Sequence, residues 1–270
     1  MKFSDIRLFL FDMDGTLYLG YDLFPFTKPL LDEIRAQGKT YLFMTNNSSR
    51  SVDDYVKKME RLGIPAVYDD FITSSQATAA YLNENHPGLN FYVCGTASFK
   101  AELAATGVRV SDTYSDAIEG VVMGYDTELT YQKLDDVSKL LTLHPDLPYI
   151  AANPDFVCPT EYGYVPVCGS VCGMIYNATG KMPHYIGKPR PEMPLAAVDR
   201  IAKKDPLVTK DTTLVVGDRV YTDIACGVHA GIHSLLVLSG ESTMDDVAKS
   251  DVKPEFILQD CGELLDQIKR

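Results

Sequence analysis

The sequence predicts an α/β fold: a doubly wound parallel sheet of the Rossmann-like kind, covered by helices. Short apolar runs alternate along the chain with stretches whose apolar residues recur at helical spacing, as in parallel sheets joined by helices. The apolar runs are nearly continuous, as in residues 6–11, which is typical of strands buried on both faces. Several of these runs end in polar or acidic clusters, where a parallel sheet places its ligand site.

Each expected element rests on a local signal. Gly38 and Gly63 end amphipathic stretches, and Ser74 can cap the helix that follows it. The expected strands are residues 6–11, 40–44, 72, 91–94, 121–124, 149–152, 213–216, 234–238 and 256–258. The expected helices are residues 29–37, 52–62, 98–105, 131–143, 193–203, 221–229 and 264–269. Residues 154–180 are rich in glycine, proline and cysteine and carry no readable pattern.

The composition is that of a globular protein with an acidic balance. The chain has 270 residues, of which 46% are hydrophobic and 23% charged, so it can bury a full core. Its formal net charge is -12, which should repel nucleic acid and anionic lipid, and we expect neither nucleic acid nor a membrane as a partner. The negative net charge does not exclude a small phosphorylated metabolite as a partner, because a binding site can be locally cationic.

The cysteines and the N-terminus predict a cytoplasmic protein. None of the six cysteines forms a Cys-x-x-Cys pair, and no histidine lies close enough in sequence to Cys168 and Cys172 to complete a zinc set. We expect reduced thiols, and the role of Cys168 and Cys172 stays open. The first residues lack the apolar region and cleavage site of a signal peptide, and no apolar run approaches the length of a membrane span.

Four polar segments can carry chemistry, and three of them directly follow expected strands. The first places two carboxylates two residues apart, and the second offers a hydroxyl and backbone amides that suit a phosphate oxygen. The third holds a lysine in stiff, proline-rich backbone, and the fourth adds two further carboxylates. They are Asp12-Met13-Asp14-Gly15-Thr16, Thr45-Asn46-Asn47-Ser48, Gly187-Lys188-Pro189-Arg190 and Gly217-Asp218-Arg219-Val220-Tyr221-Thr222-Asp223.

Each segment alone also has an ordinary structural explanation. Asp14-Gly15 is a common turn signal, and residues 45–48 are all of types that cap helices. Lys188 could be a solvated surface lysine, and Asp218 or Asp223 could be a helix N-cap or an acid in the first turn of a helix. The order of the four segments favours a site, because parallel strands bring their carboxyl ends to one edge. Carboxylates gathered there would repel one another unless Lys188 and a cation such as Mg²⁺ offset them.

Together the segments resemble the haloacid-dehalogenase superfamily of phosphatases. That family has Asp-x-Asp-x-Thr, then Ser or Thr after the second strand, then Lys, then Gly-Asp with a second acid close by. The matching residues here are Asp12, Asp14, Thr16, Thr45, Lys188, Gly217, Asp218 and Asp223. Residues 45–48, 153–155 and 187–189 are similar to the NagD-like, para-nitrophenylphosphatase branch of the family.

The resemblance implies a discontinuous catalytic core, residues 1–77 and 183–270, with an inserted α/β cap domain at residues 78–182. Periodicity alone does not decide whether this middle block is an inserted domain. The branch also implies a possible homodimer formed through the cap. Several cap residues could touch substrate or could equally be structural loop residues, namely Asp126, Asn153, Asp155, Glu161 and Tyr162.

The resemblance also implies the mechanism, a magnesium-dependent hydrolysis of phosphate monoesters. Asp12 is then the nucleophile and becomes an aspartyl-phosphate, and Asp14 is the general acid and base. Thr45, the Asn46 amide and Lys188 hold the phosphoryl oxygens. Asp12, the Asp14 backbone carbonyl and Asp218 hold Mg²⁺, while Asp223 binds a metal-ligated water or orients Lys188.

Two other functions remain open on the sequence. A phosphotransferase or mutase is one, although residues 18–39 leave little room for the small helical cap of such relatives. A metabolite-binding regulator on the same scaffold is the other, and the intact set of Asp12, Asp14, Lys188 and Asp218 argues against it. The natural substrate, the cap residues that select it and the oligomeric state cannot be read from the sequence.

Overall fold

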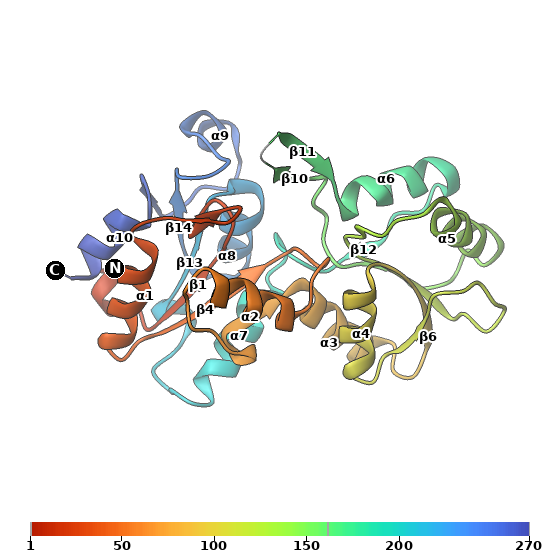
Figure 1. Ribbon diagram of the computed structural model, residues 1–270, viewed down its shortest axis with the longest axis horizontal. Helices are drawn as coiled ribbons and strands as arrows, with labels where there is room; N and C mark the ends of the chain where they lie inside the picture. The colour runs from red at the N-terminus through yellow and green to blue at the C-terminus, as the bar shows by residue number, and fades with distance from the viewer. Residues whose placement is uncertain (1, 161, 270) are drawn as a thin grey trace. The chain divides into compact units, whose positions relative to one another are not determined.

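The protein consists of two compact units, seen in a computed structural model that describes residues 2–160 and 162–269 (Figure 1). Unit 1 contains Met1–Thr45, Val56–Ile72 and Lys188–Arg270, and unit 2 contains Asn46–Tyr55 and Thr73–Gly187. The expected cap, residues 78–182, falls within unit 2, and a cap function for that unit stays a prediction.

Unit 1 is built on a six-stranded sheet in the order β15-β14-β13-β1-β4-β5. The pairings from β15 to β4 are all parallel, and the chain winds outward in both directions from the centre of the sheet. All four residues of β1 are completely buried, which explains its unbroken apolar sequence. The strands are β1 (Leu8–Phe11), β4 (Thr40–Thr45), β5 (Phe71–Thr73), β13 (Thr213–Gly217), β14 (His233–Val237) and β15 (Phe256–Leu258).

Four of the helices around this sheet pack as two pairs. The helix α1 packs against α10, and α7 packs against α8. A short antiparallel hairpin of β2 (Tyr18–Leu19) and β3 (Asp22–Leu23) follows β1. The helices are α1 (Thr27–Ala36), α2 (Val52–Arg61), α7 (Glu192–Ala202), α8 (Ala225–Ala230), α9 (Met244–Lys249) and α10 (Cys261–Ile268).

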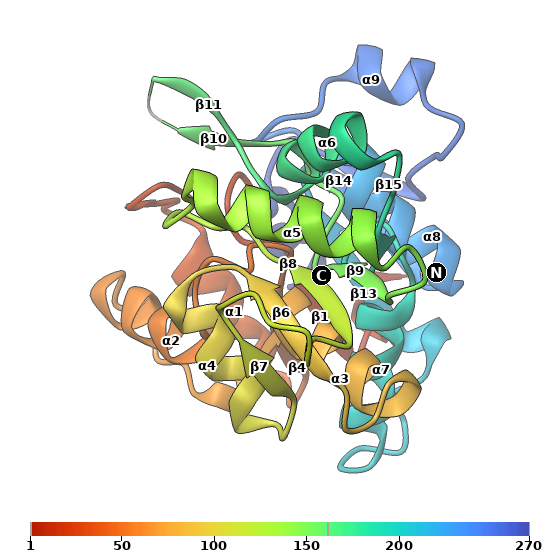
Figure 2. The ribbon, with the colours of Figure 1, turned by 90° about the vertical axis from the view of Figure 1, so that its right-hand side faces the viewer.

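Unit 2 has its own five-stranded parallel sheet in the order β12-β9-β8-β6-β7. Its strands are β6 (Asn90–Cys94), β7 (Arg109–Ser111), β8 (Gly120–Met123), β9 (Tyr149–Ala151) and β12 (His184–Tyr185). Figure 2 shows α5 (Tyr131–Leu143) and α6 (Cys168–Thr179) on one face, and α3 (Ser74–Asn85) and α4 (Ala97–Ala105) on the other. Tyr92 and Cys94 of β6 belong to the core cluster under α5 and α6, while Phe91 and Val93 belong to the second cluster, as strand alternation requires.

The segment without a readable pattern holds a hairpin and a helix. Its strands are β10 (Val157–Thr160) and β11 (Gly163–Pro166), and α6 follows them. Cys168 and Cys172 lie one turn apart on α6, are fully buried, and are free thiols. Gly169 serves tight packing here, because a Cβ at this position would collide with the Pro154 carbonyl.

The expected helix at residues 221–229 differs in detail. Residues Val220–Ile224 form a π-helical turn, and only Ala225–Ala230 are α-helical. Helical spacing does not reveal such a widened turn, and widened turns are frequent next to functional sites. None of the helices formed by the described residues is long and apolar enough to cross a bilayer.

Candidate active site

The central strands of unit 1 bring three of the predicted segments to one edge of the sheet. Phe11 at the end of β1 pairs with Val216 of β13 and with Phe43 of β4. The Asp12 amide continues this ladder by donating to the Val216 carbonyl over 2.8 Å. Asp12 and Asp218 therefore leave adjacent strands at the same end, which is where open parallel sheets place their ligands.

Lys188 joins two of the aspartates. Its Nζ lies 2.6 Å from Asp12 Oδ1 and 2.6 Å from Asp223 Oδ1, and it donates to the Met44 carbonyl over 3.2 Å. The side chain is only 3% exposed, so burial by itself would lower the pKa of Lys188. The carboxylates of Asp12 and Asp223 outweigh burial and raise that pKa, which keeps the ammonium charged.

Asp12, Asp218 and Asp223 form a group suited to a cation. One carboxylate oxygen from each lies within 4.8 Å of those from the other two. Burial, with repulsion by Asp12 and Asp223, raises the pKa of Asp218 to about 8. Burial raises the pKa of Asp12 to about 6, although Lys188 opposes the change. Three carboxylates packed this closely against one ammonium leave an excess of negative charge that a divalent cation would offset.

One oxygen of Asp218 gives a direct test of this fit. Asp218 Oδ2 accepts a hydrogen bond from the Glu241 amide over 2.7 Å. Oδ1 is buried and has no hydrogen-bond partner among the described residues. A buried carboxylate oxygen without a donor is costly unless a cation binds it. The all-oxygen donor set fits Mg²⁺, which accepts few carboxylates and keeps several waters.

Glycines allow the backbone to approach these acids. A Cβ at Gly217 would overlap the Asp223 side chain, and a Cβ at Gly240 would overlap the Asp218 carboxylate. Gly15 has a φ of +83°, and a Cβ there would lie 2.5 Å from Asp218 Oδ2. Glycine at these positions is thus a steric requirement of the acidic group.

Asp14 lies outside the three-acid group. Its side chain is 44% exposed, and Oδ1 accepts from the Gly20 amide of the hairpin over 3.1 Å. Its other oxygen, Oδ2, lies 3.6 Å from Lys58 Nζ. The group of Asp14 that is predicted to bind the metal is its backbone carbonyl. The position of its carboxylate therefore does not test that prediction. Thr45 ends β4 in the same unit and is 7% exposed.

The remaining predicted residues belong to unit 2, where several form a network. Asn46 Nδ2 donates to both carboxylate oxygens of Asp155, over 3.2 and 3.1 Å. Asn153 Nδ2 donates to the Asn46 carbonyl over 2.7 Å, and the pair is almost fully buried. Asp126 Oδ2 lies 2.7 Å from Lys133 Nζ, and the role of Asp126 stays open between substrate contact and structure. Tyr162 is 83% exposed, and Glu161 lies outside the described residues.

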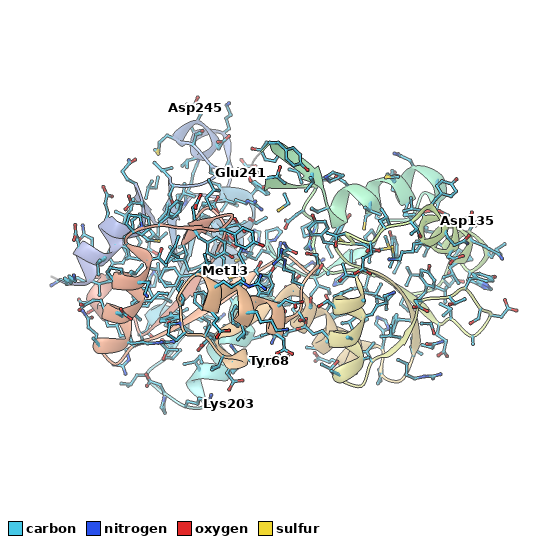
Figure 3. The ribbon with its side chains drawn as sticks, in the orientation of Figure 1. Met13, Tyr68, Asp135, Lys203, Glu241 and Asp245 are labelled. Atoms are coloured by element: carbon cyan, nitrogen blue, oxygen red, sulfur yellow. The ribbon has the colours of Figure 1, made fainter. Side chains whose placement is uncertain are left out.

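The segment that follows β14 also contacts the site, although the sequence did not predict it. Ser239 Oγ donates to the Gly15 carbonyl over 2.7 Å, and the Ser242 amide donates to the Asp218 carbonyl over 3.0 Å. Glu241 Oε2 lies 2.8 Å from Arg219 Nε, and Figure 3 labels Glu241 in this segment. Ser239-Gly240-Glu241-Ser242 directly follows an expected strand, so its position was the signal that could have found it. Lys58, inside an amphipathic helix, carried no such signal.

Comparison with known proteins agrees with this geometry. Residues 9–109 match the haloacid dehalogenase-like hydrolase family, and residues 185–264 match the HAD-hydrolase-like family. The acid sugar phosphatase of Staphylococcus aureus is 30% identical over 264 residues, which cover 98% of each chain.

Solved structures give the same result. The 4-nitrophenylphosphatase of Thermotoga maritima has a TM-score of 0.89 and 36% identity, with 98% of each chain covered. A glycerol phosphate phosphatase from Mycobacterium tuberculosis, solved in complex with magnesium, has a TM-score of 0.86 and 31% identity. The match covers 99% of this chain and 79% of that one.

The parallel sheet wrapped by helices confirms the predicted α/β fold class, and the carboxylates at the sheet edge are those of a phosphoryl-transfer hydrolase. The chain belongs to the haloacid dehalogenase-like hydrolase family. It is a phosphatase, similar to the NagD and nitrophenylphosphatase type of that family.

Proposed function

We propose that this phosphatase hydrolyses small phosphorylated metabolites, with sugar phosphates and glycerol phosphate as the first candidates, through an aspartyl-phosphate on Asp12. The observation that carries the proposal is the Lys188 ammonium held between Asp12 and Asp223, beside an Asp218 oxygen that lacks a donor. The substrate candidates come from the relatives named acid sugar phosphatase and glycerol phosphate phosphatase.

Asp12 is the proposed nucleophile because it is the partly exposed member of the acidic group. Its side chain is 15% exposed, whereas that of Asp223 is 1% exposed and its Oδ1 is bound by Lys188. An Asp12 oxygen forms a bond to phosphorus, and the bond between phosphorus and the ester oxygen breaks. Water then forms a bond to the same phosphorus and releases phosphate as the bond to Asp12 breaks.

Asp14 moves the protons in both half-reactions. It gives a proton to the leaving ester oxygen in the first step and takes a proton from the attacking water in the second. Its exposure of 44% and its separation from the three-acid group suit a carboxylate that must exchange protons. Lys188 and Thr45 neutralise and hold the transferring oxygens in this scheme, and the contribution of Asn46 stays a prediction.

A magnesium ion would be held by Asp12, the Asp14 carbonyl and Asp218, with Asp223 orienting Lys188. When bound, the ion supplies positive charge that offsets the repulsion between the phosphate and the carboxylates. The buried donor-free oxygen of Asp218 is the feature that supports a cation at this position.

The decisive experiment measures phosphate release from a panel of sugar phosphates, glycerol phosphate and other phosphorylated metabolites, with Mg²⁺ and with excess EDTA. Wild type is compared with Asp12→Asn and with Asp199→Asn, an exposed aspartate of α7. We expect turnover only with metal, and a loss of at least about a thousandfold in Asp12→Asn alone.

Other outcomes would replace the proposal. Residual activity above about a tenth of the wild-type rate in Asp12→Asn would reject the nucleophile. Binding of phosphate esters without turnover would favour a regulator, and transfer of phosphate to a second sugar without release would favour a mutase.

A further inference from the structure

Two groups restrain the two carboxylate oxygens of Asp14. Oδ1 accepts from the Gly20 amide over 3.1 Å, and Oδ2 lies 3.6 Å from Lys58 Nζ. Gly20 has a φ of +61° in the turn between β2 and β3, so the hairpin backbone presents this amide. Asp14 is 44% exposed, and a carboxylate so open to solvent would otherwise sample several rotamers.

Lys58 is held far more firmly than a surface lysine of a helix. Its side chain is 11% exposed, and its ammonium lies 4.0 Å from the centre of the Tyr18 ring and 5.6 Å from that of Tyr21. These tyrosines flank Gly20 on the same hairpin. The aromatic faces attract the ammonium and limit its positions. Lys58 and the hairpin therefore act as a preorganised pair of restraints on Asp14.

The adjacent lysine provides a contrast. Lys57 precedes Lys58 on α2 and is exposed, as expected for the outer face of an amphipathic helix. Lys58 is instead directed to the hairpin and to Asp14, although a buried lysine costs free energy unless an anion offsets its charge. Packing on the tyrosine rings alone could be supplied by an uncharged side chain of similar length.

We propose that Lys58 is a positioning residue that holds the Asp14 carboxylate in the orientation needed to transfer a proton to the leaving oxygen. This proposal rests on the function proposed above. Lys58 does not itself touch the phosphoryl group in this scheme. It fixes the carboxylate with its charge, and general acid catalysis is sensitive to displacements of about 1 Å.

The proposal predicts a dependence on the leaving group. An alkyl phosphate releases a strongly basic alkoxide that needs the Asp14 proton as the ester bond breaks, whereas p-nitrophenolate can leave without one. We therefore compare kcat/KM for an alkyl phosphate and for p-nitrophenyl phosphate, because this quantity ends with the first irreversible step. The proteins are wild type, Lys58→Met, Lys58→Gln, Lys58→Arg and the control Lys57→Met.

We expect Lys58→Met and Lys58→Gln to lose about ten- to a hundredfold in kcat/KM with the alkyl ester, and less than about threefold with the nitrophenyl ester. Lys58→Arg, which keeps the charge, should recover most of the loss, and Lys57→Met should match wild type. Equal losses with both esters, no loss, or failure of both neutral variants to fold would overturn the proposal, because Lys58 would then serve the fold alone.

The same data separate this proposal from the one on which it rests. If wild type hydrolyses the esters and Asp12→Asn does not, the proposed function stands whatever Lys58 does. If wild type hydrolyses no phosphate ester, the proposed function fails and the role of Lys58 fails with it.

Discussion

At the residue scale, Gly240 shows how closely the backbone surrounds the acidic group. A Cβ at this position would overlap the Asp218 carboxylate, while the next amide, that of Glu241, donates to Asp218 Oδ2. Because the Glu241 amide occupies Oδ2, Oδ1 is the oxygen that remains available to a cation. Some groups fix the orientation of a metal ligand in this way. Altering such a group commonly lowers the affinity for the metal by about ten- to a hundredfold.

Gly240→Ala should therefore weaken the binding of Mg²⁺ by about tenfold or more, because the added methyl group forces Asp218 to move. Isothermal titration of the protein with MgCl₂ measures this directly, without turnover. Gly173→Ala is the matched control, because a Cβ at Gly173 has nothing within 4 Å. Equal affinities in both variants would show that Asp218 tolerates the displacement.

The residues of the site differ in how readily the sequence reveals them. Asp12, Asp218 and Asp223 could be brought together from the sequence, because strand-end position and residue type point to a shared edge of the sheet. Lys188 follows no expected strand, and only its place in the order of the four segments predicted it. Lys58 could not, because one helical lysine resembles another until the fold directs it to a partner. The same holds for the Glu241 amide, since a backbone donor carries no sequence signal.

At the element scale, α4 contains an acid with no visible partner. Glu102 is 8% exposed, and both of its carboxylate oxygens are buried without a hydrogen bond among the described residues. Burial, with repulsion by Asp53 and Asp54, raises the pKa of Glu102 to about 7. The folded state therefore holds this proton more tightly than the unfolded state does.

The stability of unit 2 should fall as the pH rises from about 4.5 to about 7, by on the order of 1–3 kcal/mol through Glu102. The contribution is fully present below the unfolded pKa and is lost as the pH passes through the folded pKa. Glu102→Gln should remove this dependence of stability on pH, measured as the free energy of unfolding in urea at a series of pH values. Glu84→Gln, at an exposed position of α3, should leave it unchanged.

The elements themselves were largely predictable, and the exceptions have physical causes. Buried parallel strands need continuous apolar residues, so the strands of both sheets stand out in the sequence. The strands Val157–Thr160 and Gly163–Pro166 pair as an antiparallel hairpin, which lacks the alternation that a core-facing strand would show. The helix α6 has small residues where it packs closely. A helix is usually recognised by large apolar residues at helical spacing, and that signal is weak here.

At the scale of the whole molecule, the acidic group is a source of instability that binding would remove. Asp12, Asp218 and Asp223 repel one another in the folded chain, and only the folded chain brings them together. A cation bound there stabilises the folded state by mass action, by about 2.7 kcal/mol at a hundred times its dissociation constant. Function and stability are thus in opposition when metal is absent.

At about pH 9, above the folded pKa of Asp218, Asp218→Asn should raise the thermal midpoint of the metal-free protein by a few degrees, because it removes one buried negative charge. The same variant should lose most of the increase that Mg²⁺ gives to wild type. Differential scanning calorimetry with EDTA and with Mg²⁺ measures both effects. Asp266→Asn, at an exposed position of α10, should behave as wild type. A lower metal-free midpoint for Asp218→Asn would contradict the repulsion argument.

The pairing of β1 with β13 has a consequence for synthesis on the ribosome. Leu8 pairs with Thr213, so the first strand of the pair waits for about 200 residues before its partner leaves the exit tunnel. At roughly 5–20 residues per second this delay lasts about 10–40 s. During that time Leu8–Phe11 presents an apolar strand edge to chaperones, whereas unit 2 can complete its sheet earlier. Nascent chains arrested before residue 213 should therefore be the ones that chaperones retain.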